Sequence, residues 1–321
     1  MKKFMLLAAC LVLSVSFARA LEYKLAHVYE TTFPWHIGAE KAAELVKERT
    51  NGRVTIKVYP SSVLGTEGEI TEQAIMGGLD IAESGSGQIS NVYKPMNITS
   101  MPYIFDDNAH ALKFLKSDKW EEMKEDMLQK TGARIVGSAT WGLRHIIGNR
   151  GIKTPADLDN FKLRVPDQRV TVQYAIAMGA KPTPTAYGEA YMALQQNVVD
   201  GLENPITAIK SMKFDEVAKH LSLTGHVVTL VHFIMNEDSF QQMSKDDQKI
   251  FLECMAEASD WIHSEIDKQD RDLVEVMKTQ GVTVYECDRE AFAKKTRSMS
   301  EDYKGDWKDF GDLYTYIQNL K

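Results

Sequence analysis

The chain has 321 residues, with 45 acidic and 38 basic side chains and a formal net charge of -7 at pH 7. This acidic balance argues against nucleic acid or an anionic membrane surface as the partner, because both attract basic proteins. The length exceeds what one hydrophobic core usually serves, so two lobes are expected.

The first segment, residues 1–20, predicts a secretory signal peptide. Two lysines precede an apolar run, and small residues at Ala18 and Ala20 suit cleavage after Ala20. The letters LAAC around Cys10 would also suit lipoprotein processing, but the apolar stretch before them is short, so cleavage is favoured. No later run is long enough to span a bilayer. Loss of this segment removes three cations and changes the formal charge from -7 to -10.

Strand and helix patterns then alternate along the chain, which predicts an α/β fold with parallel sheets covered by helices. A helix is expected to begin at Pro34 and to end near Gly52. Thr154 and Pro155 are typical of the start of a short helical turn. The expected strands cover residues 23–28, 53–59, 133–139, 144–149, 161–165 and 282–287.

Residues 246–280 contain neither proline nor glycine, and their apolar residues recur at helical spacing. One helix of about 35 residues would measure about 50 Å and would cross both lobes. Two helices with a bend near residues 267–271 fit the pattern equally well.

Two segments of the chain resemble each other. AIMGGLDIAES and LQQNVVDGLEN both predict a helix, a tight turn and a strand. If the two lobes are related, Glu83 and Ser84 match Glu203 and Asn204 at equivalent strand ends. Ligands of open α/β sheets bind beyond the carboxyl ends of strands, so both pairs are expected to face one cleft. Chance similarity is the alternative.

Two arginines occupy comparable positions. Arg144 opens the strand in WGLRHIIGN, and Arg164 lies inside the strand in KLRVP. A guanidinium group keeps its charge, so an arginine in a half-buried strand needs an anionic partner, either within the protein or on a ligand. Their separation allows neighbouring strands of one lobe, where the pair would suit one carboxylate.

Three consecutive segments, TWGLRHIIGNRGIKTPADLDNFKLRVPDQ, MGAKPTPTAYGEAYMALQQNVVDGLENP and HLSLTGHVV, resemble the solute receptors of tripartite ATP-independent periplasmic (TRAP) transporters, the DctP-like family. The stretch LAHVYETTFPWHIGAEK resembles the opening of the same family, so the likeness covers nearly all of the mature chain. It implies a periplasmic binding protein of two α/β lobes, joined by crossing strands and a long helix. Such a receptor closes on an organic acid and delivers it to integral membrane permease subunits, with no catalysis and no cofactor.

The resemblance also implies lobe boundaries and site residues. Lobe I is expected to comprise residues 21–141 and 230–269, and lobe II residues 142–229 and 270–321. By the same likeness, the ligand carboxylate forms its main salt bridge with Arg164 and further contacts with Arg144 and Asn204. Glu83 matches a position that accepts hydrogen bonds from ligand hydroxyls in some members, with a structural role as the alternative.

Four further residues are weaker candidates for ligand contact. Ser86 either faces the cleft from the SGSG turn or only shapes that turn. Glu67 follows the SSVLG loop, where a solvated acid at a helix start is the alternative. His27 ends the first strand and either donates to a ligand oxygen or is a core histidine. Tyr187 is expected to pack against the ligand carbon skeleton, and Tyr191 to be the core residue.

The segments HVYETT, SGS and LTGHVV resemble family members that bind uronates and related sugar acids. A C4-dicarboxylate or a keto or aromatic carboxylate is the alternative, since Trp35, Tyr93 and Trp141 could line a less polar pocket. A receptor fold without a ligand is disfavoured, because unpaired arginines in a closing cleft are costly. A secreted hydrolase with Ser86 as nucleophile is a further alternative to a receptor, but ESGSGQ lacks the G-x-S-x-G elbow.

The sequence gives little indication of a metal site or a disulfide. The histidines and cysteines do not have the spacing of a zinc site, so no metal is expected. Cys254 and Cys287 remain after signal removal and allow one disulfide, which the sequence does not decide.

Overall fold

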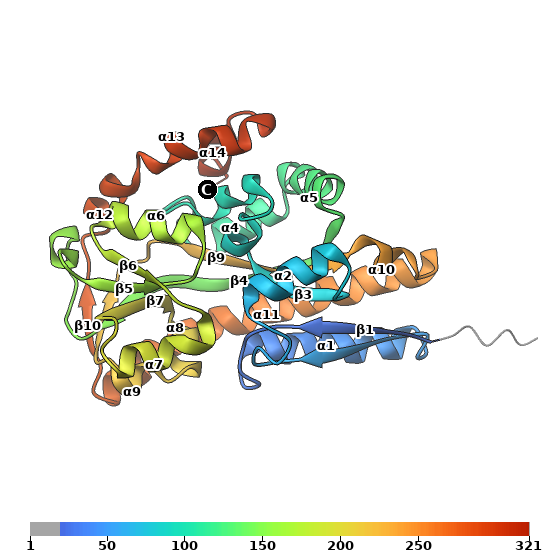
Figure 1. The fold of residues 1–321 in the computed structure, drawn as a ribbon, viewed down its shortest axis with the longest axis horizontal. Coiled ribbons are helices and arrows are strands. Elements are labelled where there is room, and N and C mark those ends of the chain that lie inside the picture. Colours follow the sequence, from blue (N-terminus) through green and yellow to red (C-terminus); the bar gives the residue numbers. More distant parts are fainter. Residues whose placement is uncertain (1–19, 321) are drawn as a thin grey trace, which may run out of the picture.

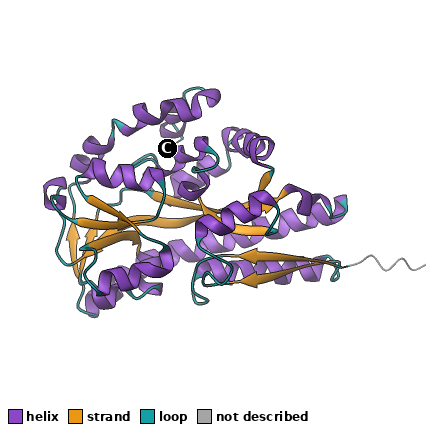
Figure 2. Ribbon diagram, in the orientation of Figure 1, coloured by secondary structure: helices purple, strands orange, loops and turns teal. Residues whose placement is uncertain are grey.

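The computed structural model describes residues 20–320, so the predicted signal peptide lies outside the described residues except for Ala20. Two α/β lobes lie side by side in Figure 1, and β4 runs through both of them. Figure 2 shows the strands in the middle of the molecule with helices packed around them.

Lobe I is built on a sheet with the strand order β2-β1-β3-β9-β4. β1 is parallel to β2 and β3, whereas β9 is antiparallel to both β3 and β4. The strands are β1 (Leu21–Ala26), β2 (Val54–Tyr59), β3 (Ile81–Gly85), β4 (Ala133–Gly148) and β9 (Val228–Asn236). The helices are α1 (Pro34–Arg49), α2 (Glu67–Met76), α3 (Ser86–Ile89), η1 (Lys94–Ser100), α4 (Asn108–Leu115), α5 (Asp118–Thr131) and α10 (Glu237–Gln241).

Lobe II continues from β4 with the strand order β4-β7-β5-β6, and β8 pairs with both β4 and β10. The strands are β5 (Lys162–Val165), β6 (Lys181–Pro184), β7 (Gly201–Pro205), β8 (His220–Leu223) and β10 (Thr283–Glu286). The helices are η2 (Pro155–Leu158), α6 (Arg169–Met178), η3 (Tyr187–Glu189), α7 (Ala190–Gln195), α8 (Ile206–Ser211) and α9 (Phe214–Val217).

Two long elements join the lobes. β4 is one strand of 16 residues, so the prediction of two strands separated at the Trp-Gly pair is wrong. The chain bulges between Thr140 and Gly142, and β9 pairs with β4 on both sides of the bulge, which keeps the strand continuous. Gly142 has a φ of 110°, a conformation that favours glycine.

The second long element is α11 (Lys245–Thr279), a single helix of 35 residues that packs against α1, β4 and α8. Of the two arrangements that the sequence allowed, the structure therefore has the continuous helix. Its buried residues are mostly apolar and recur at helical spacing, and Ser244 caps its start by accepting from the Asp247 N–H at 3.1 Å.

Most local predictions are confirmed to within a few residues, including α1, β1, β2, β5 and β10. Thr154 forms the predicted capping box with Asp157 at the start of η2. The prediction of parallel sheets is only partly right, because β4 and β9 run antiparallel to their neighbours. β7 lies between β4 and β5, so Arg144 and Arg164 are not on neighbouring strands as expected.

The two similar segments adopt the same arrangement. β3 follows α2 and lies parallel to β1, and β7 follows α7 and lies parallel to β5. The aspartate before each strand plays the same part, since Asp80 accepts the backbone N–H of Lys24 at 2.9 Å and Asp200 accepts that of Lys162 at 2.8 Å. Glu83 and Glu203 are therefore structural equivalents.

The C-terminal segment passes from lobe II back to lobe I (Figure 1) through α12 (Arg289–Thr296), α13 (Met299–Tyr303), η4 (Lys304–Phe310) and α14 (Leu313–Gln318). Asn97 of η1 donates to Asp306 at 2.7 Å, and the His110 ring bonds the carbonyl of Ile317 at 2.8 Å. This segment contacts both lobes, and the division of the chain at the expected boundaries stays a prediction.

The fold also answers the questions of disulfide pairing and membrane spans. Cys254 and Cys287 are both free thiols, and Cys254 is buried. Within residues 20–320, no helix combines the length and apolar character needed to cross a membrane.

Candidate functional site

A cavity of about 850 Å³ is lined by residues of both lobes. Its volume falls within the range of small-molecule sites. Of the eight residues proposed from the sequence, five line it: Arg144, Arg164, Asn204, Tyr187 and Glu67.

Arg164 lies on β5 and is 1% exposed. Its Nε and Nη2 both donate to the backbone carbonyl of Thr185, which fixes the plane of the guanidinium. Its Nη1 is buried and has no partner among the described residues. Burial lowers the pKa of Arg164 to about 10; the Glu203 charge opposes this effect and the Arg144 charge adds to it. Among the described residues, no carboxylate forms an ion pair with Arg164.

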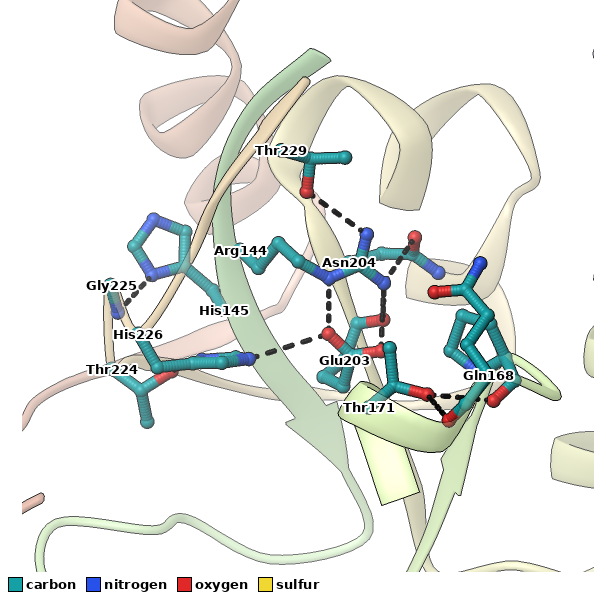
Figure 3. Close-up of polar contacts among 11 residues, drawn as sticks. Arg144, His145, Gln168, Thr171, Glu203, Asn204, Thr224, Gly225, His226 and Thr229 are labelled. Atoms are coloured by element: carbon teal, nitrogen blue, oxygen red, sulfur yellow. Dashed lines mark hydrogen bonds and ion pairs between the residues drawn. The ribbon is translucent and has the colours of Figure 1, made fainter. Parts of the chain in front are cut away.

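Arg144 lies on β4, and its guanidinium is paired with Glu203 of the adjacent strand β7 (Figure 3). Nε donates to one carboxylate oxygen of Glu203, and Nη2 donates to the other at 2.7 Å. Nη1 donates to the Thr229 hydroxyl at 3.2 Å. The charge of Arg144 is thus balanced inside the protein.

Glu203 is fully buried, and its second neighbour is the ring of His226, at 3.3 Å from Oε2. Burial acts to raise the pKa of Glu203, but Arg144 and His226 overcome this effect and hold it at about 2. The carboxylate therefore stays ionised and keeps Arg144 in place.

Asn204 connects this ion pair to the cavity. Its Oδ1 accepts from Arg144 Nη2 at 3.2 Å, so its amide group is oriented by the arginine. Its Nδ2 is buried and has no acceptor among residues 20–320. Arg164 Nη1 and Asn204 Nδ2 are two buried donors without acceptors, and both residues line the same cavity. Such donors are rare in native interiors and indicate a missing acceptor.

Aromatic side chains form one wall of the cavity. The rings of Tyr29 and Trp141 lie 5.5 Å apart, and Tyr187 lies 5.9 Å from each of them. Flat aromatic faces suit the carbon skeleton of a small organic molecule. Of the three aromatic residues that the sequence offered for a less polar pocket, only Trp141 lines the cavity, while Trp35 and Tyr93 lie in the core.

Glu67 is the first residue of α2 and is half-buried. Its Oε1 accepts the backbone N–H of Gly85 at 2.7 Å, which ties the start of α2 to the end of β3. Burial raises the pKa of Glu67, while the Gly85 N–H, Arg144 and Arg164 act to lower it.

The other three candidates do not line the cavity. Glu83 lies on β3 in the core with 0% exposure, and neither of its carboxyl oxygens has a hydrogen-bond partner in the described chain. Burial raises the pKa of Glu83 well above its usual value. The expectation that Glu83, Ser84, Glu203 and Asn204 all face one cleft is therefore corrected, because only Asn204 lines it. Ser84 instead bonds Thr71 of α2 at 2.7 Å.

Ser86 and His27 also have partners inside the protein. The Ser86 hydroxyl lies 2.8 Å from His232 Nε2, and His232 Nδ1 lies 2.8 Å from the Ser138 hydroxyl. His27 Nδ1 accepts the Tyr29 N–H at 3.1 Å, and its Nε2 lies 3.1 Å from His36. Both residues are 1% exposed and neither lines the cavity, so their contact with a ligand stays a prediction.

Sequence reasoning did not identify the groups that hold the two guanidinium groups in place. The Thr185 carbonyl is a backbone group and leaves no mark in the sequence. Glu203 stands beside Asn204 in GLENP, and its match to Glu83 in the two similar segments was the available signal. Across residues 20–320, no three His, Cys, Asp or Glu side chains are grouped to hold a metal ion.

Comparisons with known proteins agree with this architecture. Residues 25–307 match the DctP family, described as bacterial extracellular solute-binding protein, family 7. The sialic acid-binding periplasmic protein SiaP of Vibrio cholerae is 31% identical over 265 residues, which cover 83% of each chain. The 2,3-diketo-L-gulonate-binding periplasmic protein YiaO of Escherichia coli is 31% identical over 278 residues, 85% of this chain and 84% of its own.

A solved structure shares the whole fold. The crystal structure of a TRAP periplasmic solute binding protein from Chromohalobacter salexigens, with bound D-glucuronate, has a TM-score of 0.89 and 26% identity, covering 93% of this chain and 100% of the other. The two-lobed fold expected from the sequence is therefore confirmed. The match to the family model extends over most of the chain, and this protein belongs to the DctP family, the solute receptors of TRAP transporters.

Proposed function

We propose that this protein is an exported receptor that captures a sugar acid, with a uronate as the leading ligand, and delivers it to the membrane subunits of a TRAP transporter. The observation that carries the proposal is the pair of unpartnered donors, Arg164 Nη1 and Asn204 Nδ2, in one cavity. A carboxylate supplies acceptor oxygens for both donors and balances the buried guanidinium of Arg164, which forms no ion pair within the described chain.

Several features support a hydroxylated ligand. The aromatic residues Tyr29, Trp141 and Tyr187 offer a surface for the carbon skeleton, and Glu67 offers an acceptor for hydroxyl groups. The relatives point to the same chemistry, because sialic acid, 2,3-diketo-L-gulonate and D-glucuronate each carry one carboxylate and several hydroxyl groups.

The protein acts by binding and not by catalysis under this proposal. The strongest catalytic arrangement is the Ser86–His232 pair, but its third member is the Ser138 hydroxyl where a hydrolase needs an acid. The Ser86 hydroxyl is also buried and does not line the cavity. Periplasmic export follows from the predicted signal peptide, with cleavage after Ala20 as part of the proposal.

A thermal-shift screen followed by calorimetry tests the proposal, because a ligand that binds only the native state raises the melting temperature. The panel contains D-glucuronate, D-galacturonate, D-gluconate, succinate, pyruvate and phenylacetate, with neutral D-glucose as the matched control for the carboxylate. We expect a rise with one or more sugar acids and none with glucose. A rise only with succinate would favour the C4-dicarboxylate alternative. A rise only with pyruvate or phenylacetate would favour a keto or aromatic acid.

A further inference from the structure

Three arginines line the cavity: Arg144 and Arg164 are buried, and Arg169 is exposed and lies 3.7 Å from Asp306. The charge of Arg144 is already balanced by Glu203 through two oxygen contacts. Of the two buried arginines, only Arg164 forms no ion pair with a carboxylate of the described chain. One buried guanidinium is thus available to balance one carboxylate.

Glu67 adds a negative charge to the same cavity. It comes from lobe I, whereas Arg164 and Asn204 come from lobe II, so the two sets of groups face the ligand from different lobes. The Gly85 N–H holds its Oε1 at 2.7 Å, and no described residue donates to Oε2. A Cβ atom at position 85 would lie 3.2 Å from Oε1, closer than most such contacts, so a glycine there leaves space for the carboxylate.

We infer that Glu67 is the residue that selects monocarboxylates over dicarboxylates in this receptor. A ligand whose carboxylate binds Arg164 presents its other groups to Glu67. A hydroxyl group can donate a hydrogen bond to Oε2. A second carboxylate cannot donate and would place a like charge beside Glu67 in a desolvated cleft, which is strongly unfavourable.

The inference rests on the proposed function and makes it narrower. A uronate and the aldarate with the same carbon skeleton share one carboxylate, and the aldarate has a second carboxylate at C1, where the uronate closes into a ring as a hemiacetal. This difference in shape is the same for the wild type and Glu67→Gln, so a change of preference between the two proteins reports the charge of Glu67. The receptor should therefore bind D-glucuronate and reject D-glucarate, and it should bind D-galacturonate and reject galactarate.

Calorimetry with these two matched pairs tests the inference on the full mature protein. The variants are Glu67→Gln and, as the control, Glu40→Gln, which changes an exposed glutamate of α1 that does not line the cavity. We expect the wild type to prefer the uronate by about tenfold or more. Glu67→Gln should weaken uronate binding, strengthen aldarate binding and so reduce the preference about tenfold, and Glu40→Gln should keep it.

The outcomes separate this inference from the proposed function. Equal binding of a uronate and its aldarate by the wild type, or an unchanged preference in Glu67→Gln, overturns the role of Glu67 and leaves a sugar-acid receptor. Tighter binding of the aldarate by the wild type overturns the role as well. Binding of neither member of either pair, together with no shift by any sugar acid in the thermal screen, overturns both. Glu67→Ser is a second variant without the charge if Glu67→Gln does not fold, and an unchanged preference in it overturns the role of Glu67 as well.

Discussion

Glu83 on β3 and Glu203 on β7 occupy equivalent positions in two matching helix–turn–strand units, yet only Glu203 has a cationic partner. Both side chains have 0% exposure. Glu203 forms two contacts with Arg144, whereas both oxygens of Glu83 lack a partner in the described chain. The two carboxyl groups should therefore respond in opposite ways to neutralisation.

Neutralising Glu203 should destabilise the protein. Glu203→Gln leaves the buried Arg144 guanidinium without its counter-charge, and removing one partner of a buried ion pair costs about 3 to 5 kcal/mol. Urea unfolding at pH 7 measures the loss. A loss below about 1 kcal/mol would mean that Arg144 does not depend on this pair. The control is Glu237→Gln, which removes a partly exposed partner of Arg134.

Neutralising Glu83 should stabilise the protein at high pH. Burial raises the pKa of Glu83 in the folded state, so its favourable contribution exists at low pH and is lost as the pH rises through that folded pKa. Glu83→Gln has no proton to lose. Its stability relative to the wild type should therefore increase between pH 5 and pH 9 in urea unfolding, with unchanged ligand affinity. If the free energies of unfolding of the wild type and Glu83→Gln changed with pH in the same way, the raised pKa of Glu83 would be contradicted.

Mild acid should weaken the fold through three buried histidines. Burial lowers the pKa of His27, His145 and His232 to about 3. The unfolded chain binds these protons near pH 6.5 and the folded chain does not, so stability is lost as the pH falls from about 6.5 toward 3, by about 1.4 kcal/mol per pH unit for each histidine.

Urea unfolding at pH 7, 6 and 5 measures this slope. His232→Gln can keep hydrogen bonds to Ser86 and Ser138 but binds no proton, so it should make the slope smaller by about one proton. An unchanged slope in His232→Gln would contradict the account.

Ligand should make the protein more compact in solution. Gly87 of α3 and Gln168 of lobe II meet beside the cavity, where a Cβ atom at Gly87 would overlap Gln168 Oε1. A ligand that contacts both lobes favours the arrangement in which they meet. We expect X-ray scattering to give a smaller radius of gyration with saturating uronate than without ligand.

A bulky residue at this contact should oppose closure. Gly87→Leu should reduce both the compaction and the affinity, while Gly188→Leu should change neither, because no atom lies within 4 Å of a Cβ at Gly188. Identical scattering of the wild type with and without a bound ligand would exclude the closing cleft.

Much of the fold could be predicted because its signals are local. Alternating apolar residues mark β1 and β2, and an uninterrupted helical pattern marks α11. The similar segments also predicted two equivalent units, which the matching roles of Asp80 and Asp200 confirm. The continuity of β4 was missed, because a Trp-Gly pair resembles a turn until β9 pairs with both sides of it.

The site was harder to predict, because its charges are balanced over long distances in the chain. Nothing local distinguishes Glu83 from Glu203, and only the pairing of β4 with β7 brings Arg144, 59 residues away, to one of them. Arg164 has no such carboxylate partner, because its guanidinium donates to the backbone carbonyl of Thr185. Residue type thus identified the two arginines, but not which of them has a free charge.

The most direct test of the account is calorimetric titration of D-glucuronate into the wild type and Arg164→Lys. Lysine keeps the charge but loses the planar group that the Thr185 carbonyl aligns, so we expect affinity to fall by about 2 kcal/mol or more, roughly thirtyfold, with the fold intact. D-Glucose, which lacks the carboxylate, should bind neither protein. Wild-type affinity in Arg164→Lys, or binding of glucose as tight as that of glucuronate, would contradict the central claim that Arg164 binds the ligand carboxylate.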